Sequence, residues 1–154
     1  MKELEAMQRC ADWCSQSEHC LSELRDKLSK LGVEPDAAQR IEKQLVAERF
    51  IAERRYVEYY IRDKARFNGW GPMKIRFQLS LKRIDSKIVD AALREFDTAV
   101  FDEQLERALR NKLRLTKNAD KQKLRASLLR FGASRGFDYN AVYKAVDRLI
   151  DDDM

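Results

Sequence analysis

The chain has 154 residues, which suits one ordinary domain or a few small units that share a core. Hydrophobic residues make up 44% and charged residues 37%, and only 2 Pro and 5 Gly interrupt a composition rich in helix formers. No apolar run approaches the roughly 18 residues of a membrane span, and the start lacks the pattern of a secretory signal. The 3 cysteines all fall within residues 10–20, which favours a reducing compartment. We therefore expect an all-α cytoplasmic protein without a membrane partner.

The first fifty residues predict three helices with apolar side chains at three- and four-residue steps. Ser15 and Glu18 have the spacing of a capping box for the second helix, which ends at Gly32. Pro35 suits the first turn of the third helix. The residues expected to face inward are Leu4, Met7, Cys10, Ala11, Cys14, Leu21, Leu24, Leu28, Leu31, Ala38, Ile41, Leu45 and Val46.

The same order of elements returns in residues 51–98. Residues 51–67 predict a long helix, with Tyr56, Tyr60 and Phe67 near one face. Residues 68–71 predict a turn, after which Pro72 restarts a helix. Asp85 is expected to cap a short helix. The residues available for burial in these two helices are Ile75, Phe77, Leu79, Ile88, Ala91, Ala92 and Leu93.

A third set of three helices is predicted in the rest of the chain. Residues 101–115 predict an amphipathic helix and residues 116–119 a polar connector. The apolar residues Leu124, Leu128 and Phe131 predict a further helix. Asp138 is expected to cap the last helix. The expected core residues of this part are Phe101, Leu105, Leu109, Leu113, Leu124, Leu128, Phe131, Val142, Ala145, Val146 and Leu149.

Each middle helix ends in a small or basic residue followed by an apolar one: Gly32-Val33, Arg83-Ile84 and Gly136-Phe137. The apolar residues of these pairs lie 51 and 53 positions apart. Repeats of about this length indicate stacked helical units whose faces are buried by their neighbours. We predict three helical repeats, at residues 1–50, 51–98 and 99–154.

The net charge of +5 is concentrated near the C-terminal end. Residues 107–135 hold 10 basic residues and a single acidic one, Asp120. Such a patch indicates a polyanionic partner such as nucleic acid, although a merely solvated helix face is an equally good interpretation at this modest net charge. The basic residues expected near DNA are Arg110, Lys112, Arg114, Lys117, Lys121, Lys123 and Arg125.

No motif of the sequence assembles a nucleophile, a base and an oxyanion site, so we expect no enzyme and no cofactor. Cys10, Cys14 and Cys20 with the single histidine, His19, could hold zinc, but they lack the close Cys-x-x-Cys pairs of small zinc sites. Cys10 and Cys14 also fall on the apolar stripe of the first helix. Core packing is therefore the favoured interpretation of the cysteines.

A mixed aromatic and basic surface is the remaining candidate for function. Residues 56–76 interleave aromatic side chains with Lys and Arg across a helix, a turn and the next helix. Trp, Tyr and Arg are favoured anchors at protein interfaces, and the same mixture can stack bases and contact phosphates. Burial in the core is the favoured interpretation of Tyr56, Tyr60 and Phe67, because they lie near one face, whereas Trp70 in its glycine turn is the residue we expect to be functional.

These segments resemble the RecX family of regulatory proteins. The resemblance is carried in order by residues 22–24, 27–28, 31–33, 50–57, 70–75, 79, 83–84, 88 and 135–137, and it spans essentially the whole chain. The chain departs from the family at Ala52, where the family usually has Asp or Asn, so we expect the N-terminal cap of that helix to be missing, at a cost of about 1 kcal/mol if nothing replaces it. It also departs at Gly132, where the family has a larger apolar residue, which predicts looser packing.

The resemblance implies tandem three-helix repeats in a curved, elongated stack that acts as a monomer. It also implies binding to the RecA–DNA filament, inhibition of RecA, and at most weak or indirect contact with single-stranded DNA. The residues we assign to the filament are Glu53, Arg54, Arg55, Arg62, Arg66, Trp70, Lys74, Arg76, Lys82 and Arg83. A stand-alone DNA-binding protein and an adaptor for an unrelated protein are the alternatives.

Overall fold

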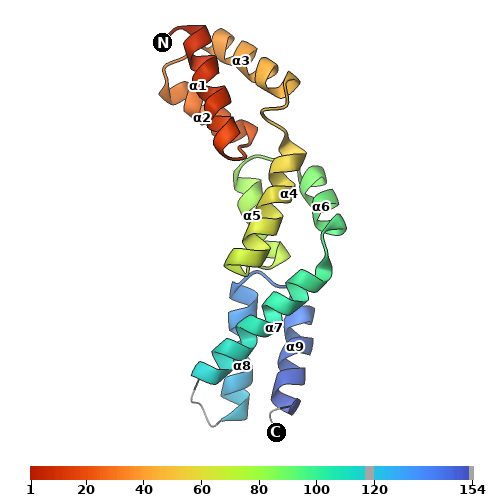
Figure 1. Cartoon of the computed structure of the whole chain (residues 1–154). Helices are drawn as coiled ribbons and strands as arrows, with labels where there is room; N and C mark the ends of the chain where they lie inside the picture. The colour runs from red at the N-terminus through yellow and green to blue at the C-terminus, as the bar shows by residue number, and fades with distance from the viewer. Residues whose placement is uncertain (117–119, 153–154) are drawn as a thin grey trace. The chain divides into compact units, whose positions relative to one another are not determined.

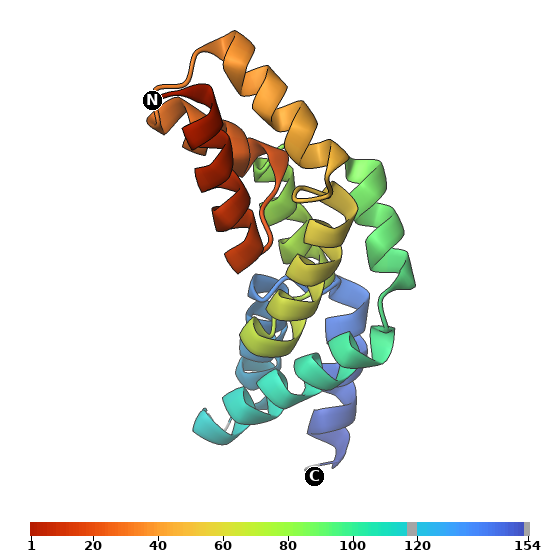
Figure 2. The same ribbon diagram turned by 45° about the horizontal axis from the view of Figure 1, so that its top comes forward.

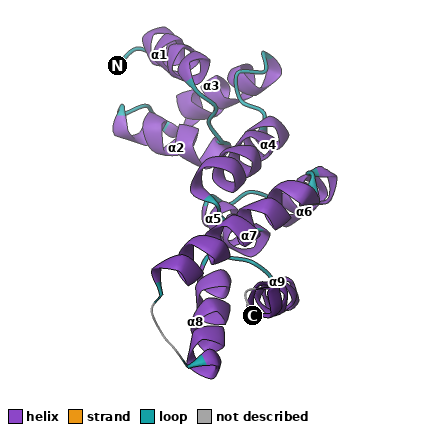
Figure 3. Cartoon of the chain, turned by 60° about the horizontal axis from the view of Figure 1, so that its bottom comes forward, coloured by secondary structure: helices purple, strands orange, loops and turns teal. Residues whose placement is uncertain are grey.

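The computed structural model describes residues 1–116 and 120–152, and in these ranges it contains α-helices, one short π-helix and no strand (Figure 3). The predicted all-α class is confirmed. The elements are α1 (Glu3–Gln16), α2 (Leu21–Lys30), α3 (Pro35–Ala47), α4 (Glu53–Asp63), η1 (Lys64–Asn68), α5 (Pro72–Leu81), α6 (Ser86–Glu95), α7 (Thr98–Leu115), α8 (Lys121–Ser134) and α9 (Tyr139–Asp152).

Tertiary contacts divide the chain into two compact units. Unit 1 comprises Met1–Tyr59 and Leu79–Ala92, and unit 2 comprises Tyr60–Gln78 and Leu93–Met154. Helices α4, α5 and α6 contribute residues to both units. The division of the sequence into three repeats at residues 50 and 98 stays a prediction.

Unit 1 is built on the packing of α1, α2 and α3 against one another (Figure 1). Leu4 and Val46, expected inside, are 63% and 44% exposed, so these two predictions are wrong. A helix turns about 100° per residue, so Val46 points away from the side taken by Leu45, and Leu4 lies on the opposite side from Ala6. The buried cluster consists of Ala6, Cys10, Cys14, Leu24, Leu28, Ile41, Leu45 and Ile51.

The start of α2 differs from the prediction. Helix α1 continues to Gln16, and the Ser15 hydroxyl donates back to the Ala11 carbonyl at 2.9 Å, so Ser15 does not cap the next helix. Instead, Cys20 is the N-cap residue, and the Glu23 carboxylate accepts a hydrogen bond from the Cys20 N–H at 3.1 Å. The capping pattern therefore lies five residues later than the sequence suggested. Pro35 does open α3, and Asp85 does accept from the Lys87 N–H at 2.9 Å, as predicted.

The three predicted helix ends share one backbone conformation. Gly32, Arg83 and Gly136 have φ angles of 72°, 59° and 93°, all in the left-handed region. In α2 and α8 the following residue completes the same terminal pattern, because Val33 N–H donates to Leu28 and Phe137 N–H donates to Gly132. The sequence alignment of the three ends is thus matched by their geometry.

Unit 2 is built on α7, α8 and α9, which pack on one another, with α7 passing diagonally across the other two helices (Figure 2). Its interior is closely filled: a Cβ at Gly132 would lie 2.5 Å from a Val142 methyl, so the looser packing predicted at Gly132 is not found. The buried residues of α7, α8 and α9 and the loop before α9 are Val100, Phe101, Leu105, Leu109, Leu128, Leu129, Gly132, Gly136, Phe137, Val142, Ala145, Val146 and Leu149.

The predicted long helix over residues 51–67 changes its winding near its end. Residues Lys64–Asn68 form the π-helix η1, in which hydrogen bonds span one residue more than in an α-helix. The slower winding turns Phe67 away from the side where Tyr56 and Tyr60 are buried, and Phe67 is 83% exposed. The prediction of a buried Phe67 is therefore wrong, and Phe77, at 59% exposure, also lies outside the core.

Candidate interaction surface

The turn between η1 and α5 is fixed by backbone hydrogen bonds. Gly69 follows η1 in the left-handed conformation, with φ of 67°, and its N–H donates to the Lys64 carbonyl. The N–H of Trp70 donates to the same carbonyl at 3.1 Å. Only a residue without a Cβ adopts this conformation at little cost, so Gly69 sets the position of Trp70.

Two lysines lie over the Trp70 ring. The Lys64 Nζ is 5.2 Å from the centre of the ring, and the Lys74 Nζ is 4.7 Å away. The buried Tyr60 ring is tilted against it, with 6.5 Å between ring centroids. Each ammonium gains electrostatic energy from the indole face. Trp70 and Lys74, both assigned to the filament from the sequence, therefore belong to one cluster on unit 2.

The same turn is bound to the end of α8. The Gly71 N–H donates to the Arg135 carbonyl at 2.8 Å, and the Met73 N–H donates to the Gly136 carbonyl at 2.9 Å. The Arg135 guanidinium donates in return to the Asn68 carbonyl at 3.2 Å. These bonds join the Trp70 turn and the α8 end within unit 2.

A pocket of about 230 Å³ lies beside this junction. The Gln104 side chain on α7 donates to the Arg66 carbonyl at 3.3 Å, which holds η1 against α7. Three arginines and three amide side chains surround the pocket, and its lining contains no carboxylate. The lining residues are Arg66, Phe67, Asn68, Gly69, Gln104, Arg107, Ala108, Asn111 and Arg135.

Several residues assigned to the filament from the sequence form contacts inside unit 1. The Glu53 carboxylate accepts from the Leu21 N–H at 2.7 Å, and Lys82 pairs with Glu23 at 3.1 Å. Arg55 pairs with Glu18, with Nε 2.9 Å from Oε1, and also donates to the carbonyls of Arg49 and Phe50. Arg54 pairs with Glu58 at 2.8 Å. Each of these side chains has a structural task in addition to any role in binding.

Two of these carboxylates have shifted pKa values of opposite sign. Burial raises the pKa of Glu53, because its hydrogen bond from Leu21 and the charge of Arg25 do not fully offset the lost hydration. Burial acts on Glu23 in the same direction, but the Cys20 N–H and the Lys82 ammonium outweigh it and lower the pKa of Glu23. The ion pair with Lys82 therefore favours the ionised form of Glu23 at neutral pH.

Other residues of the predicted set remain on the surface. Arg62 on α4, Arg66 on η1, Arg76 on α5 and Arg83 after α5 are all exposed. Within residues 1–116 and 120–152, neither Arg62 nor Arg66 has an ion pair. Arg83 holds its left-handed conformation without the freedom of glycine, which costs about 1–2 kcal/mol. Strain of this kind is typical of functional positions.

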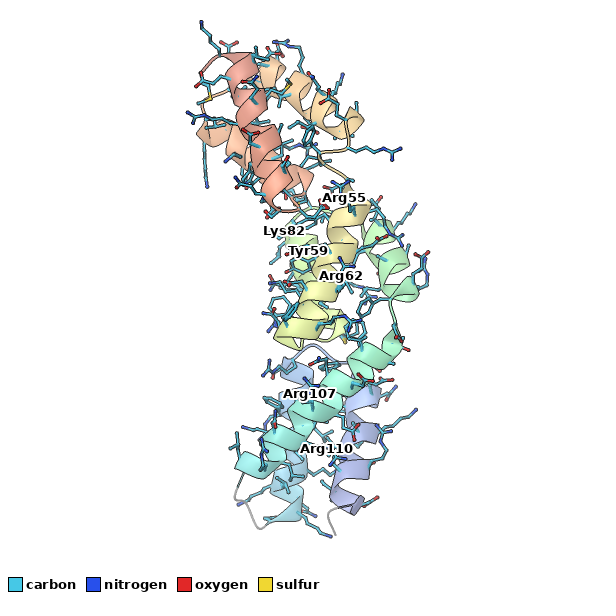
Figure 4. All side chains as sticks on the ribbon, in the orientation of Figure 1. Arg55, Tyr59, Arg62, Lys82, Arg107 and Arg110 are labelled. Carbon is cyan, nitrogen blue, oxygen red and sulfur yellow. The ribbon has the colours of Figure 1, made fainter. Side chains whose placement is uncertain are left out.

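The basic residues predicted to lie near DNA have varied surroundings (Figure 4 labels Arg107 and Arg110 on α7). Arg110 pairs with Glu106 at 3.0 Å, and Arg125 pairs with Asp147 and lies over the Tyr143 ring. Lys112 lies over the Phe131 ring, and Arg114 donates to the Asn111 side chain at 2.8 Å. Lys121 and Lys123 are exposed in the first turn of α8, and Lys117 lies outside the described residues.

The cysteine cluster is part of the core. Cys10, Cys14 and Cys20 are buried thiols, and burial raises the pKa of Cys14 to about 11. The His19 ring stacks on Trp13 with 3.5 Å between centroids and lies near Glu23. In the part of the chain that the structure describes, no three potential ligands come together for a metal ion. This geometry fits the core-packing interpretation of the cysteines.

Sequence reasoning did not bring Arg107, Arg135 and Phe67 together in one site. Arg107 and Arg135 were counted in the basic patch without an assigned contact, and Phe67 was placed in the core. The exposure of Phe67 depends on the π-helix, which side-chain periodicity does not indicate. Arg135 did stand next to the repeated Gly136-Phe137 pair, and this adjacency was the available signal.

Exposed arginines beside an aromatic anchor, on a helical scaffold, are typical of a binding protein. Residues 53–93 match the family model for the second three-helix domain of RecX. The regulatory protein RecX of Pseudomonas fluorescens is 34% identical over 140 residues, which cover 90% of this chain and 88% of that protein. The chain belongs to the RecX family, whose members are regulatory proteins and not enzymes.

Further relatives agree on family and fold. RecX of Clostridium perfringens is 33% identical over 129 residues, which cover 82% of this chain but only 60% of that protein. The crystal structure of RecX from Lactobacillus salivarius superposes with a TM-score of 0.86, at 20% identity and over 96% of each chain. A second RecX crystal structure superposes with a TM-score of 0.85. In the residues described, no helix is both long and apolar enough to cross a membrane.

Proposed function

We propose that this protein binds the RecA–DNA filament and inhibits the recombinase, ATPase and co-protease activities of RecA. The observation that carries the proposal is the match to RecX of P. fluorescens over 88% of that protein. The RecA filament forms in the bacterial cytoplasm, so this function goes with the cytoplasmic location expected from the sequence. We also propose that the chain acts as a monomer built from three repeats.

The contacts of unit 2 support a specific binding surface. Arg62, Arg66 and Arg76 are exposed, and the Trp70–Lys74 cluster gives the same part of the chain an aromatic anchor. Arginine and tryptophan bury much area at an interface while keeping a polar end, and they are enriched among the residues that dominate binding energy. We assign filament binding chiefly to these residues.

In unit 1, Glu53, Arg55 and Lys82 have partners within the protein. A filament contact by any of them would compete with an existing hydrogen bond or ion pair. We therefore propose that Glu53 and Arg55 support binding indirectly by holding the start of α4. Lys82 and Arg83 add positive charge at the end of α5.

Charge reversal tests this assignment. The double substitution Arg62→Glu with Arg76→Glu is compared with Lys43→Glu and Arg94→Glu, which changes the net charge equally at two exposed positions outside the proposed surface. Binding to RecA filaments on single-stranded DNA is measured by surface-immobilised filament assays at fixed salt. We expect the first pair to weaken binding at least tenfold and the control pair to leave it within about twofold.

Equal weakening by both pairs would show that only net charge matters and would remove the proposed surface. Absence of filament binding by the folded wild-type protein would overturn the function itself. Binding of bare duplex DNA that both pairs left unchanged would favour the alternative of a stand-alone DNA-binding protein.

A further inference from the structure

Helix α5 carries apolar side chains on two opposite sides. Ile75 and Leu79 are fully buried, whereas Met73, Phe77 and Leu81 are 53%, 59% and 62% exposed. Successive residues of an α-helix turn by about 100°, so the three exposed side chains lie on adjacent turns, opposite the two buried ones. We call these three residues the α5 outer face. Their spacing depends on this one helix alone.

The core does not require an apolar outer face. A helix that only covers a core has one apolar stripe and a polar opposite side. Polar residues at the three exposed positions would leave the burial of Ile75 and Leu79 unchanged. Large apolar side chains that gather on exposed turns of one helix are typical of a surface that another molecule covers.

We propose that the α5 outer face is the docking site for an amphipathic helix of a RecA subunit, with acidic residues beside its apolar stripe. This inference rests on the proposed function, because the filament supplies the partner. It adds an apolar contact to the arginines and the Trp70–Lys74 cluster assigned above, and it names the kind of element that is bound.

The geometry of the outer face favours a helix as its occupant. Its side chains are four residues apart, which is about 6 Å along the axis, and a second helix presents apolar side chains at a similar interval. The backbone groups along α5 are bonded within the helix. An extended peptide laid on it would therefore leave its own N–H and C=O groups without protein partners, whereas a helix bonds them internally.

The charges on and after α5 favour an acidic partner. Residues 72–84 contain no acidic residue, and their basic residues are Lys74, Arg76, Lys82 and Arg83. Arg76 directly precedes Phe77, and Arg83 follows Leu81 by two positions; both arginines are exposed. Charges around an apolar contact select a partner of complementary potential. A second copy of this chain would bring its own basic α5 against the first, and the like charges disfavour that pair.

The side chains of the outer face distinguish a protein partner from nucleic acid. Met73 and Leu81 have no flat ring on which a base could stack. Methionine adapts its shape to an apolar partner and is common at protein-binding surfaces. The outer face is therefore suited to the apolar side chains of another protein.

Site-specific photo-crosslinking on RecA filaments, with the full chain, tests the proposal. Phe77 is replaced by p-benzoylphenylalanine, which keeps the aromatic ring, and mass spectrometry identifies the crosslinked segment. We expect it to be a RecA helix whose apolar residues, at three- and four-residue steps, are flanked by Asp or Glu. The same reporter in place of Leu4, which is 63% exposed on α1, is the control and should not reach that helix.

Substitutions separate the apolar contact from the charges. Phe77→Ser should weaken filament binding about 5- to 30-fold, as for an aromatic anchor of an interface. It should keep the wild-type slope of log affinity against log salt, because salt screens charges. The Arg62→Glu, Arg76→Glu variant should reduce that slope. Leu81→Ser should also weaken binding, and Leu4→Ser is its matched control because the two leucines are equally exposed. Circular dichroism confirms that each variant is folded.

The outcomes distinguish this inference from the proposed function. A folded wild-type chain that does not bind RecA filaments would overturn both. Filament binding by wild type that Phe77→Ser and Leu81→Ser leave unchanged would overturn the outer face alone. Crosslinks from position 77 to a strand or loop of RecA, to DNA, or to a second copy of this chain would each exclude a RecA helix as the occupant.

Discussion

Gly71 and Gly136 lie backbone to backbone where the Trp70 turn meets the end of α8. A Cβ built on Gly71 would be 2.4 Å from the Gly136 carbonyl carbon, and one built on Gly136 would be 2.2 Å from the Lys74 Cβ. Neither neighbour is the free end of a flexible side chain. The backbone bonds from Gly71 and Met73 to this segment therefore require glycine at both positions.

We predict that Gly71→Ala and Gly136→Ala each destabilise the protein by about 1–3 kcal/mol or more, because an added methyl group has no space. Gly32→Ala is the control: Gly32 has φ of 72° but no atom within 4 Å of its added Cβ, so only the left-handed conformation costs energy, about 1 kcal/mol. Urea unfolding measures all three. A larger loss at Gly32 than at Gly71 would contradict the packing argument.

At Arg83 the informative substitution introduces a glycine and does not remove one. It occupies the left-handed helix end that Gly32 and Gly136 occupy in the other two segments, so Arg83→Gly should relieve strain and raise the free energy of unfolding by up to about 1 kcal/mol. If Arg83 binds the filament, the same variant loses affinity while gaining stability. Thermal unfolding and filament binding measured on one preparation test both effects. A variant that is less stable than wild type would contradict the strain assignment.

Arg55 and Arg62 differ in whether the guanidinium has partners within the protein. Arg55 pairs with Glu18 and donates to two carbonyls, whereas Arg62 forms no ion pair in the described ranges. Arg55→Ala should cost about 1 kcal/mol of stability, a discounted figure because the side chain is 45% exposed. Arg62→Ala should stay within about 0.5 kcal/mol. Equal stability of the two variants in chemical denaturation would contradict this division.

The Glu23–Lys82 pair predicts a pH dependence. The pKa of Glu23 is lowered from its ordinary 4.5 in the folded chain, so its contribution to stability is present above that value and is lost as pH falls through the folded pKa. Wild type should therefore exceed Glu23→Gln in stability at pH 7, and the difference should shrink below pH 4.5. Denaturant unfolding at several pH values measures it. A difference that is unchanged at acid pH would exclude the ionised carboxylate as its source.

The helical class and most helix starts followed from local chemistry. Pro35, Asp85 and the three apolar pairs at 51- and 53-residue spacing specify backbone conformations, which explains their agreement with the structure. The burial of Leu4, Val46 and Phe77 was predicted wrongly. Apolar periodicity shows that a helix has an apolar face, but it does not show how much of that face a neighbouring helix covers. The cap of α2 was misplaced because α1 continued through Ser15.

The interaction surface was harder to predict. The sequence indicated an aromatic and basic segment, but not which charges form internal ion pairs, since Glu23 and Lys82 lie 59 residues apart. It also gave no sign of the π-helix that exposes Phe67. The pocket of Arg66, Arg107 and Arg135 depends on packing between η1 and α7, which a single sequence does not reveal.

The most direct test of the proposed function is ATP hydrolysis by RecA filaments preformed on single-stranded DNA, followed while the protein is added below one molecule per RecA. We predict strong inhibition by wild type and at least tenfold weaker inhibition by the Arg62→Glu, Arg76→Glu variant. Inhibition well below one per RecA indicates capping or blocked regrowth, and inhibition only near saturation indicates coating of the filament. Unchanged hydrolysis in the presence of the folded wild-type protein would contradict regulation of RecA.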